Sequence, residues 1–217
     1  MKEKVVCIFA HPDDEVIFGP AGTILHLSRS AEVHLISATS GDAGRNPFGG
    51  DLGKIREQEL QESADILGVT QVHFLGFKDG SLCNNLYHAI AEKITILMDK
   101  IKPTTIITME PRGISGHIDH ITMSFISSYL FHKLPYIKKI MYHCRIKTDK
   151  PWRQDYFIYV PPGYDKNEVD QIVDVADVWD KKLKALQAHK SQHEDVDMLL
   201  ENYKTIPKEE YFLVKEK

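Results

Sequence analysis

Two short groups of histidine and aspartate residues carry the side chains that could do chemistry in this sequence. The first, His11-Pro12-Asp13-Asp14-Glu15, follows directly on an apolar run at residues 5–10, and the second is His117-Ile118-Asp119-His120. An imidazole and three carboxylates at the end of a buried strand are costly unless a cation neutralises them. Together the groups offer two histidines and a carboxylate, a donor set that leaves one position for water, which is the layout of a hydrolytic metal site.

Each group by itself has another explanation. Acidic residues and a proline are favourable at a helix N-terminus, so the first group could be a helix start. The second could be a polar helix cap beside two surface histidines. A helix start does not account for His11 at the end of a strand, and two such groups at the ends of two strands favour the metal site.

The elements that must position these groups alternate between strand and helix. Strands are predicted at 5–10, 33–38, 72–75, 104–109, 140–146, 157–160 and 169–175, with a final edge strand at 211–214. Helices are predicted at 19–30, 52–67, from 86 to the stop at Lys102-Pro103, 117–132 and 179–189. This alternation predicts an α/β fold with a mostly parallel sheet and helices on both faces. The site then lies beyond the carboxyl ends of the strands.

Length, charge and cysteine content narrow the class of protein. The 217 residues suit a single domain over 1–217, and the formal net charge of −4 gives no basic surplus for nucleic acid. Three scattered cysteines, Cys7, Cys83 and Cys144, argue for a reducing compartment. With no membrane span and no signal-peptide pattern, we expect a cytoplasmic protein. The sequence leaves open whether the chain forms homo-oligomers.

The two groups together also resemble a known family, the PIG-L/LmbE-like de-N-acetylases. Ala10 precedes the first group as in that family, and the match covers residues 4 to about 195. Further matching segments are Ser40-Gly41-Asp42-Ala43-Gly44, Ile55-Arg56-x-x-Glu59, Leu67-Gly68, residues 72–76 with Asp79-Gly80, Lys182-Leu183-x-Ala185-Leu186 and His189-Lys190-Ser191-Gln192. The sequence departs from the family at Ile118, where many members have Pro, and at Asp42, where many have Glu.

The resemblance implies a Rossmann-like three-layer fold and metal-dependent removal of an N-acetyl group from a small N-acetylglucosamine-type substrate. It implies Zn²⁺ as the cofactor, with Fe²⁺ or another divalent metal as alternatives. It implies Asp13 as the general base, His117 as the group that stabilises the oxyanion or protonates the leaving amine, and Asp119 as the residue that orients His117. The implied metal ligands are His11, Asp14 and His120.

Four residues are candidates for substrate contacts, and each has a simpler explanation. Arg56 is a candidate by the family resemblance, but it could instead form a solvated pair with Glu59 one helical turn away. Asp79 could bind a sugar hydroxyl or could belong to a turn with the glycine that follows it. His189 could line the site or could act only on a helix dipole. Asp42 lies in the loop at 39–53 that we expect to influence specificity.

Two other functions remain open at the level of sequence. One is an amidase that acts on a thiol-conjugated or other N-acyl amine outside the sugars. The other is a non-catalytic sugar- or nucleotide-binding module on the same scaffold. Against the second, no G-x-G-x-x-G follows the first predicted strand. No G-x-S-x-G element suggests a serine nucleophile.

Overall fold

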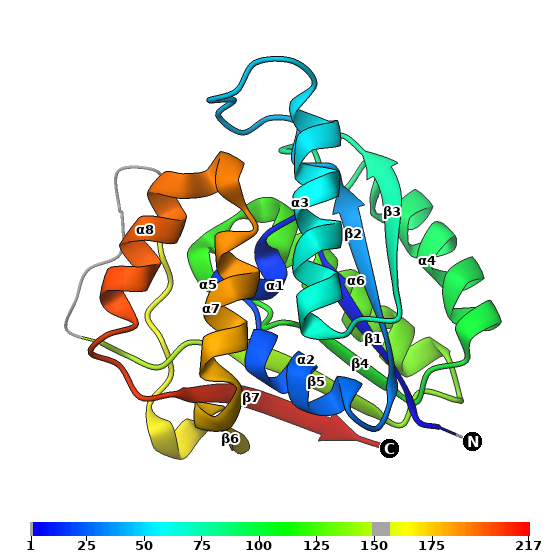
Figure 1. Ribbon diagram of the computed structural model, residues 1–217. Coiled ribbons are helices and arrows are strands. Elements are labelled where there is room, and N and C mark those ends of the chain that lie inside the picture. Colours follow the sequence, from blue (N-terminus) through cyan, green and yellow to red (C-terminus); the bar gives the residue numbers. More distant parts are fainter. Residues whose placement is uncertain (1, 149–156) are drawn as a thin grey trace.

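The computed structural model describes residues 2–148 and 157–217, and in these residues seven strands form one sheet (Figure 1). The strand order is β3-β2-β1-β4-β5-β7-β6, with the first five strands parallel and β7 antiparallel to both of its neighbours. The strands are β1 (Lys4–Phe9), β2 (Glu32–Thr39), β3 (Gln71–Phe77), β4 (Thr105–Met109), β5 (Lys139–Cys144), β6 (Gln171–Asp174) and β7 (Glu209–Glu216). The predicted α/β fold with a mostly parallel sheet is confirmed.

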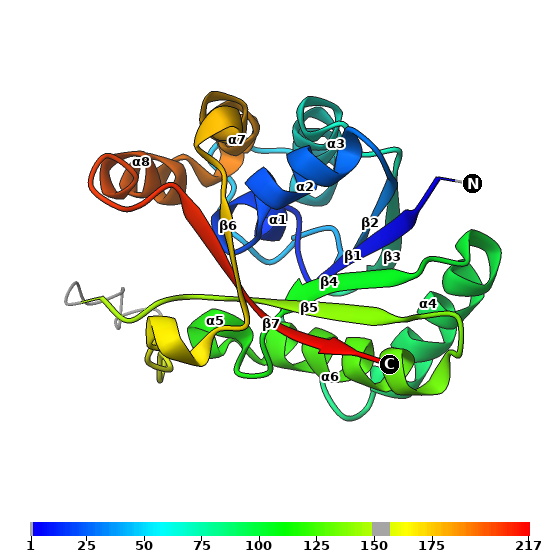
Figure 2. The same ribbon diagram turned by 90° about the horizontal axis from the view of Figure 1, so that it is seen from below.

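Helices cover both faces of this sheet. Figure 2 shows α1, α2, α3, α7 and α8 on one face and α4, α5 and α6 on the other. The helices are α1 (Asp14–Ile17), α2 (Ala21–Ser28), α3 (Leu52–Leu67), α4 (Tyr87–Ile101), α5 (Gly113–Gly116), α6 (Ile118–Lys133), α7 (Trp179–Gln187) and α8 (His193–Asn202). Three short 3₁₀ turns are η1 (Lys166–Glu168), η2 (Ala176–Val178) and η3 (Lys190–Gln192). Within the described ranges, no helix combines the length and apolar character that crossing a membrane requires.

Local chemistry explains where α3 begins and where α3 and α4 end. The carboxylate of Asp51 accepts a hydrogen bond from the Lys54 amide and caps the start of α3. That helix ends at Gly68, which has a φ of 73°, a conformation that glycine adopts without steric cost. Helix α4 ends at Ile101, two residues before Pro103, which disfavours helical geometry in the residue before it.

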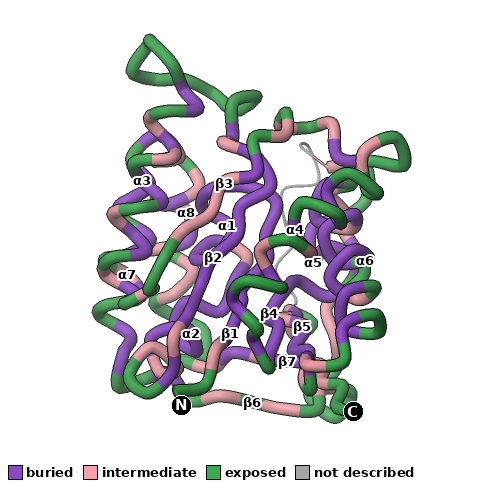
Figure 3. Tube along the Cα trace, turned by 90° about the vertical axis from the view of Figure 1, so that its right-hand side faces the viewer, coloured by how far each residue is buried: buried purple, intermediate pink, exposed green. Residues whose placement is uncertain are grey.

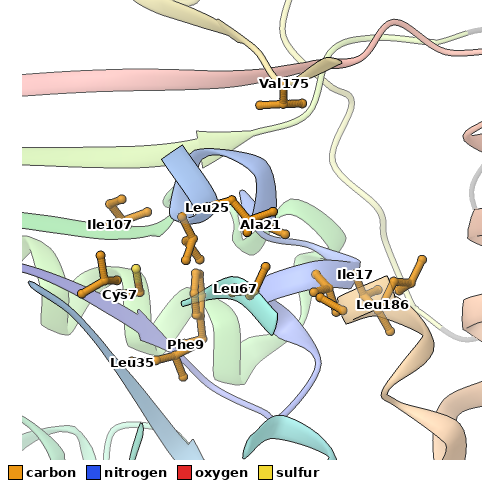
Figure 4. Close-up of a cluster of buried hydrophobic side chains, with 14 of the residues drawn as sticks. Cys7, Phe9, Ile17, Ala21, Leu25, Leu35, Leu67, Ile107, Val175 and Leu186 are labelled. Carbon is orange, nitrogen blue, oxygen red and sulfur yellow. The ribbon is translucent and has the colours of Figure 1, made fainter. Parts of the chain in front are cut away.

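The core lies on both sides of β1, because successive side chains of a strand point to opposite faces. Cys7 and Phe9 pack among the apolar side chains under α1, α2, α3 and α7, as Figure 4 shows. Val6 and Ile8 pack on the other face against α4 and α6. Figure 3 shows β1 and β2 almost continuously buried along their length. A strand buried on both faces reads as the unbroken apolar run seen at residues 5–10.

Several sequence-based predictions of elements are wrong. The last strand is not at the edge: β7 lies between β5 and β6, and β6 is the edge strand. Phe212 is fully buried on β7, although charged residues flank the short apolar run of that strand as in an edge strand. Residues 157–160 form no strand, and Ile158 there is fully exposed. Helices α1 and α8 were not predicted, and the helix expected from residue 19 begins at Ala21.

Candidate active site

The two groups of histidine and aspartate meet because the strands before them are neighbours. β1 pairs in parallel with β4, so the carboxyl ends of both strands reach the same edge of the sheet. His11 lies two residues after β1, and His120 lies in the first turn of α6, which follows β4 and α5. A cavity of about 600 Å³ opens at this point. Its walls come from the β1–α1 loop, the loop at residues 43–47, the start of α6 and the first turns of α8.

Three side chains from these groups converge in the floor of the cavity. Nδ1 of His11 lies 3.2 Å from Nε2 of His120, which lies 3.2 Å from Oδ1 of Asp14. Oδ2 of Asp14 lies 3.5 Å from Nδ1 of His11. Ligands about 2.0–2.1 Å from a tetrahedral Zn²⁺ are about 3.3 Å apart, so the spacing fits such an ion. Oδ1 of Asp14 is buried and has no hydrogen-bond partner among the described residues, as expected of an atom reserved for a cation.

Other atoms hold these three side chains in place. The backbone amides of Ala10 and His11 donate to Oδ2 of Asp14, at 3.0 and 2.8 Å. Nδ1 of His120 lies 3.1 Å from the carbonyl oxygen of Gly113, which is a hydrogen-bond acceptor and so favours the proton on Nδ1. That tautomer leaves Nε2 of His120 free of hydrogen and directed at the donor cluster. Such contacts fix the ring orientation and basicity of a metal-binding histidine.

The other ring nitrogen of His11 faces two carboxylates. Nε2 of His11 lies 2.9 Å from Oδ1 of Asp79 and 3.2 Å from Oδ2 of Asp119. Burial disfavours a charged His11, but Asp14 and these two carboxylates outweigh burial and raise its pKa well above the ordinary value. Burial likewise disfavours a charged Asp14, but His120 and His11 hold its pKa well below the ordinary value. The site therefore favours an ionised Asp14, the form in which a carboxylate binds a cation.

Two sets of three donor atoms, neither of which includes Asp14, lie within 4.8 Å of one another: His11 with His117 and His120, and His11 with Asp79 and Asp119. In the first set, Nδ1 of His117 already accepts a hydrogen bond from the Asp119 amide. In the second set, both carboxylates already accept hydrogen bonds from backbone amides. The unpartnered Oδ1 of Asp14 makes the set of His11, Asp14 and His120 the best fit.

Asp13, between His11 and Asp14, is held by an arginine rather than by the donor cluster. Nη2 of Arg56 donates to Oδ2 of Asp13 at 2.8 Å and to the carbonyl of Pro12 at 2.5 Å, and Nη1 donates to the carbonyl of Gly41. Burial raises the pKa of Asp13 to about 6, with Arg56 opposing and Asp14 reinforcing that rise. The backbone of Asp13 has a φ of 99°, in the left-handed region that non-glycine residues rarely adopt.

His117 lines the cavity as a neutral imidazole. Burial first, and then the neighbouring His120 and His11, lower its pKa to about 4. Because its Nδ1 accepts from the Asp119 amide at 3.1 Å, its proton resides on Nε2. We expected the carboxylate of Asp119 to orient His117. The structure instead places that carboxylate against His11 and the amides of Gly80 and Leu82, and only the backbone of Asp119 contacts His117.

The four predicted substrate contacts are placed differently from one another. Asp79 lines the cavity, and Asp42 lies behind it, accepting a hydrogen bond from the Asp79 amide. Arg56 also lines the cavity, but its side chain is only 5% exposed and is bonded to Asp13. It does not pair with Glu59, so the solvated-pair explanation is wrong. His189 is fully buried against Glu15 and does not line the cavity, so its assignment as a substrate contact is not supported.

The sequence-based reasoning missed several residues that shape this site. Glu15 and Glu59 bond to the segment that follows α7, and Glu110 at the end of β4 accepts hydrogen bonds from the turn that leads to α6. Phe18 lines the cavity and packs edge-on against the ring of His120. Glu15 and Glu59 stood inside motifs of the family, which was a usable signal. Nothing in the sequence marked Phe18 or the α8 wall.

Comparisons with known proteins show which family this chain is similar to. The model of the PIG-L family, GlcNAc-PI de-N-acetylase, matches residues 6–130. A probable N-acetyl-alpha-D-glucosaminyl L-malate deacetylase 2 from Bacillus subtilis is 31% identical over 201 residues, covering 89% of this chain and 85% of the relative. The diacetylchitobiose deacetylase of Thermococcus kodakarensis is 31% identical over 209 residues, covering 93% of this chain and 74% of the relative.

A solved structure shows the same fold. The N,N'-diacetylchitobiose deacetylase of Pyrococcus horikoshii, in complex with an inhibitor, aligns with a TM-score of 0.74 and 27% identity. The alignment covers 99% of this chain and 84% of that chain. Since the family model matches more than half of the residues, this chain belongs to the PIG-L/LmbE-like family of de-N-acetylases. The resemblance seen in the sequence is thereby confirmed.

Proposed function

We propose that this protein is a Zn²⁺-dependent hydrolase that removes the acetyl group from a small substrate containing N-acetylglucosamine. The observation that carries the proposal is the convergence of His11, Asp14 and His120 around a buried, unpartnered carboxylate oxygen, with Asp13 beside them. The named substrates of the relatives support the sugar: one is an N-acetylglucosaminyl malate and another is diacetylchitobiose.

The proposed ligands of the cation are His11, Asp14 and His120. A divalent cation bound there supplies Lewis acidity, which lowers the pKa of water to about 7 and polarises an amide carbonyl. Two imidazole nitrogens and one carboxylate oxygen suit Zn²⁺ and are also accepted by Fe²⁺. The chain's own contribution is to hold these donors rigidly through the amides of β1's end and the carbonyl of Gly113.

Asp13 is the proposed general base. Its carboxylate lies next to the donor cluster. Among the described residues, Arg56 donates to Oδ2 of this carboxylate and not to Oδ1. Oδ1 therefore remains to take a proton from the attacking water, and Arg56 favours the ionised form that this task requires. The same carboxyl could then return the proton to the leaving amine.

His117 is the proposed donor to the developing oxyanion. Its lowered pKa makes an imidazolium unfavourable, so the role rests on a neutral ring whose Nε2–H is fixed by the Asp119 amide. A preorganised donor of this kind is worth about 10²–10³ in rate in other hydrolases. Of the two roles that the family resemblance implies for His117, a neutral ring favours stabilising the oxyanion over protonating the leaving amine.

The direct test joins metal analysis with acetate release. Freshly purified protein should hold about one divalent ion per chain and release acetate from N-acetylglucosamine, diacetylchitobiose or N-acetylglucosaminyl malate. Asp13→Asn should keep the metal and lose at least about a hundredfold in kcat, while Asp65→Asn, an exposed aspartate on α3, should match the parent. His120→Ala should lose the metal, while His132→Ala, an exposed histidine on the same helix, should keep it.

The same panel separates the proposal from its alternatives. Activity confined to N-acyl amines without a sugar would replace it with the amidase function. A metal-loaded protein inert on every amide would favour a binding module. Asp13→Asn with parental activity would remove Asp13 as the base, and unchanged metal content in His120→Ala would remove His120 as a ligand.

We also propose that the protein works in the cytoplasm. Cys7, Cys83 and Cys144 are all free thiols, and Cys7 and Cys144 are buried. Free thiols persist in a reducing compartment. Fractionation of cells that produce the untagged protein tests the location, and recovery outside the cytoplasmic fraction would contradict it.

A further inference from the structure

Glu15 connects the loop of the proposed base to a distant part of the chain. Its side chain is fully buried and accepts three hydrogen bonds. Oε1 accepts from Oγ of Ser63 at 2.6 Å and from Nε2 of His189 at 2.7 Å. Oε2 accepts from the backbone amide of Asp13 at 3.1 Å. One carboxylate thus joins α3, the segment after α7 and the residue that we propose takes the proton.

The contact to the Asp13 amide matters because of the backbone of that residue. A φ of 99° is strained for aspartate and persists only where the surrounding structure holds it. Arg56 holds it through the carboxylate and Glu15 through the amide, and the first turn of α1 holds its carbonyl through the amides of Val16 and Ile17. If the amide were released, the residue could relax toward an ordinary backbone conformation, and its carboxylate would turn away from its present direction.

His189 is placed to hold Glu15 and nothing in the cavity. It is fully buried, and its Nε2 lies 2.7 Å from Oε1 of Glu15, while its Nδ1 has no hydrogen-bond partner among the described residues. The segment that carries it is fastened separately to α3, because the amide and hydroxyl of Ser191 both donate to Glu59, at 2.7 and 2.6 Å. Packing of the segment and the hydrogen bond to Glu15 therefore depend on different residues.

We propose that His189 is a positioning residue for the de-N-acetylation, acting through Glu15 to hold Asp13 in its left-handed conformation. The inference rests on the proposed function, in which Asp13 is the base. It gives a reason for a buried histidine near the end of the chain that contacts neither the donor cluster nor the cavity. A purely structural role would require only that residue 189 fill its space.

Two substitutions distinguish the effect of the hydrogen bond from His189 to Glu15 from the effect of the volume that the His189 ring fills. His189→Leu fills a similar volume without a donor, and His189→Gln keeps an N–H near the position of Nε2. We expect His189→Leu to lower kcat by about tenfold to a hundredfold, the scale of a small misplacement of a reacting group. KM and metal content should stay within about twofold of the parent, and His189→Gln should recover most of the kcat.

Lys190→Met is the matched control, because Lys190 is the exposed neighbour of His189 and its side chain pairs with Glu62. Its kcat should stay near that of the parent. If His189→Leu does not fold, Ser63→Ala removes the other donor to Oε1 and should lower kcat in the same direction. Parental kcat in His189→Leu, or a His189→Gln variant as impaired as His189→Leu, would overturn the inference. So would a loss in Lys190→Met as large as that in His189→Leu.

A second measurement needs no activity. Hydrogen exchange of the Asp13 amide, followed by NMR, should become faster in His189→Leu than in the parent and return toward the parental rate in His189→Gln. An unchanged exchange rate in His189→Leu would overturn the inference. If the parent releases no acetate from any amide, the proposed function fails, but this exchange experiment still decides whether His189 holds Asp13.

Discussion

The buried ion pair between α7 and β7 should contribute strongly to the stability of the fold. Nζ of Lys182 lies 2.7 Å from Oε1 of Glu210, and the two side chains are only 6% and 2% exposed. Glu210 also accepts from the amides of Gly22 and Thr23 and from the Thr23 hydroxyl, so it holds the first turn of α2. The pair therefore ties the last strand of the sheet to two helices.

Replacing Lys182 by Met should cost about 3 kcal/mol. Breaking a buried pair from one side typically costs about 3–5 kcal/mol, because the remaining charge has no counter-charge. We expect the lower end, since three donors to Glu210 remain. At about 2–4 °C per kcal/mol for a chain of this size, Tm should fall by about 6–12 °C. The neighbouring Lys181→Met is exposed and should change stability by less than about 0.5 kcal/mol.

The assay is urea unfolding of metal-free protein at pH 7, with the slope of free energy against urea compared between variants. Glu210→Gln should also destabilise, and Lys182→Met/Glu210→Gln should lose less than the sum of the single losses by about 1–3 kcal/mol. Additive losses would show that the two charges do not interact. A Lys182→Met variant within about 0.5 kcal/mol of the parent would refute the assignment of a strong buried pair.

Three further predictions concern acid stability, the loop beside the base and the turn before α6. Burial raises the pKa of Glu210, but Lys182 and His143 outweigh burial and hold that pKa below 4.5. The contribution of the ionised Glu210 to the free energy of unfolding is therefore complete above that pH and is lost as the pH falls further. The difference in stability between the parent and Glu210→Gln, measured by urea unfolding, should shrink in acid. Gly41→Ala would put Cβ 2.5 Å from the guanidinium of Arg56, which holds Asp13, and should lower kcat about tenfold. Gly49 has a similar φ but open space around it, so Gly49→Ala should keep full activity. Glu110→Gln should weaken Zn²⁺ binding about tenfold or more in a chelator competition, because Glu110 accepts hydrogen bonds from the turn before α6; unchanged affinity would contradict this.

The position of the candidate metal site could be predicted from the sequence because that position follows from a rule of topology. Strands β1 and β4 are apolar and short, and chemistry-bearing residues follow each of them. Carboxyl ends of parallel neighbours share one edge, so His11 and His120 had to approach each other once the strands were paired. The only further requirement was that the two strands be adjacent.

The hydrogen-bond partners of the charged residues around the site could not be predicted from the sequence by this rule. Glu15 is bonded to a histidine 174 residues away, and Arg56 to an aspartate 43 residues away. An acidic residue at a helix start satisfies a local rule whether or not it has a distant partner. Which partner it finds depends on how α3 and α7 pack on the sheet, and periodicity carries no information on that packing.

The interior position of β7 was hidden for a related reason. Its apolar run is only four residues long, at 211–214, and charged residues flank it on both sides, which is typical of an edge strand. Glu210, next to that run, carries a charge that is buried, and Lys182 on α7 compensates it. A buried charged residue reads as exposed in the sequence unless its counter-charge is known.

The insertion of β7 between β5 and β6 also sets an order of events during synthesis. Residues 209–216 leave the ribosome after every other strand, and until then β5 has an open edge and β6 has no neighbour in the sheet. An open strand edge is a template for pairing with other chains. The nascent protein therefore exposes this edge to aggregation between the synthesis of β5 and that of β7, and stalled synthesis of residues 145–208 should lower its soluble yield more than stalling elsewhere.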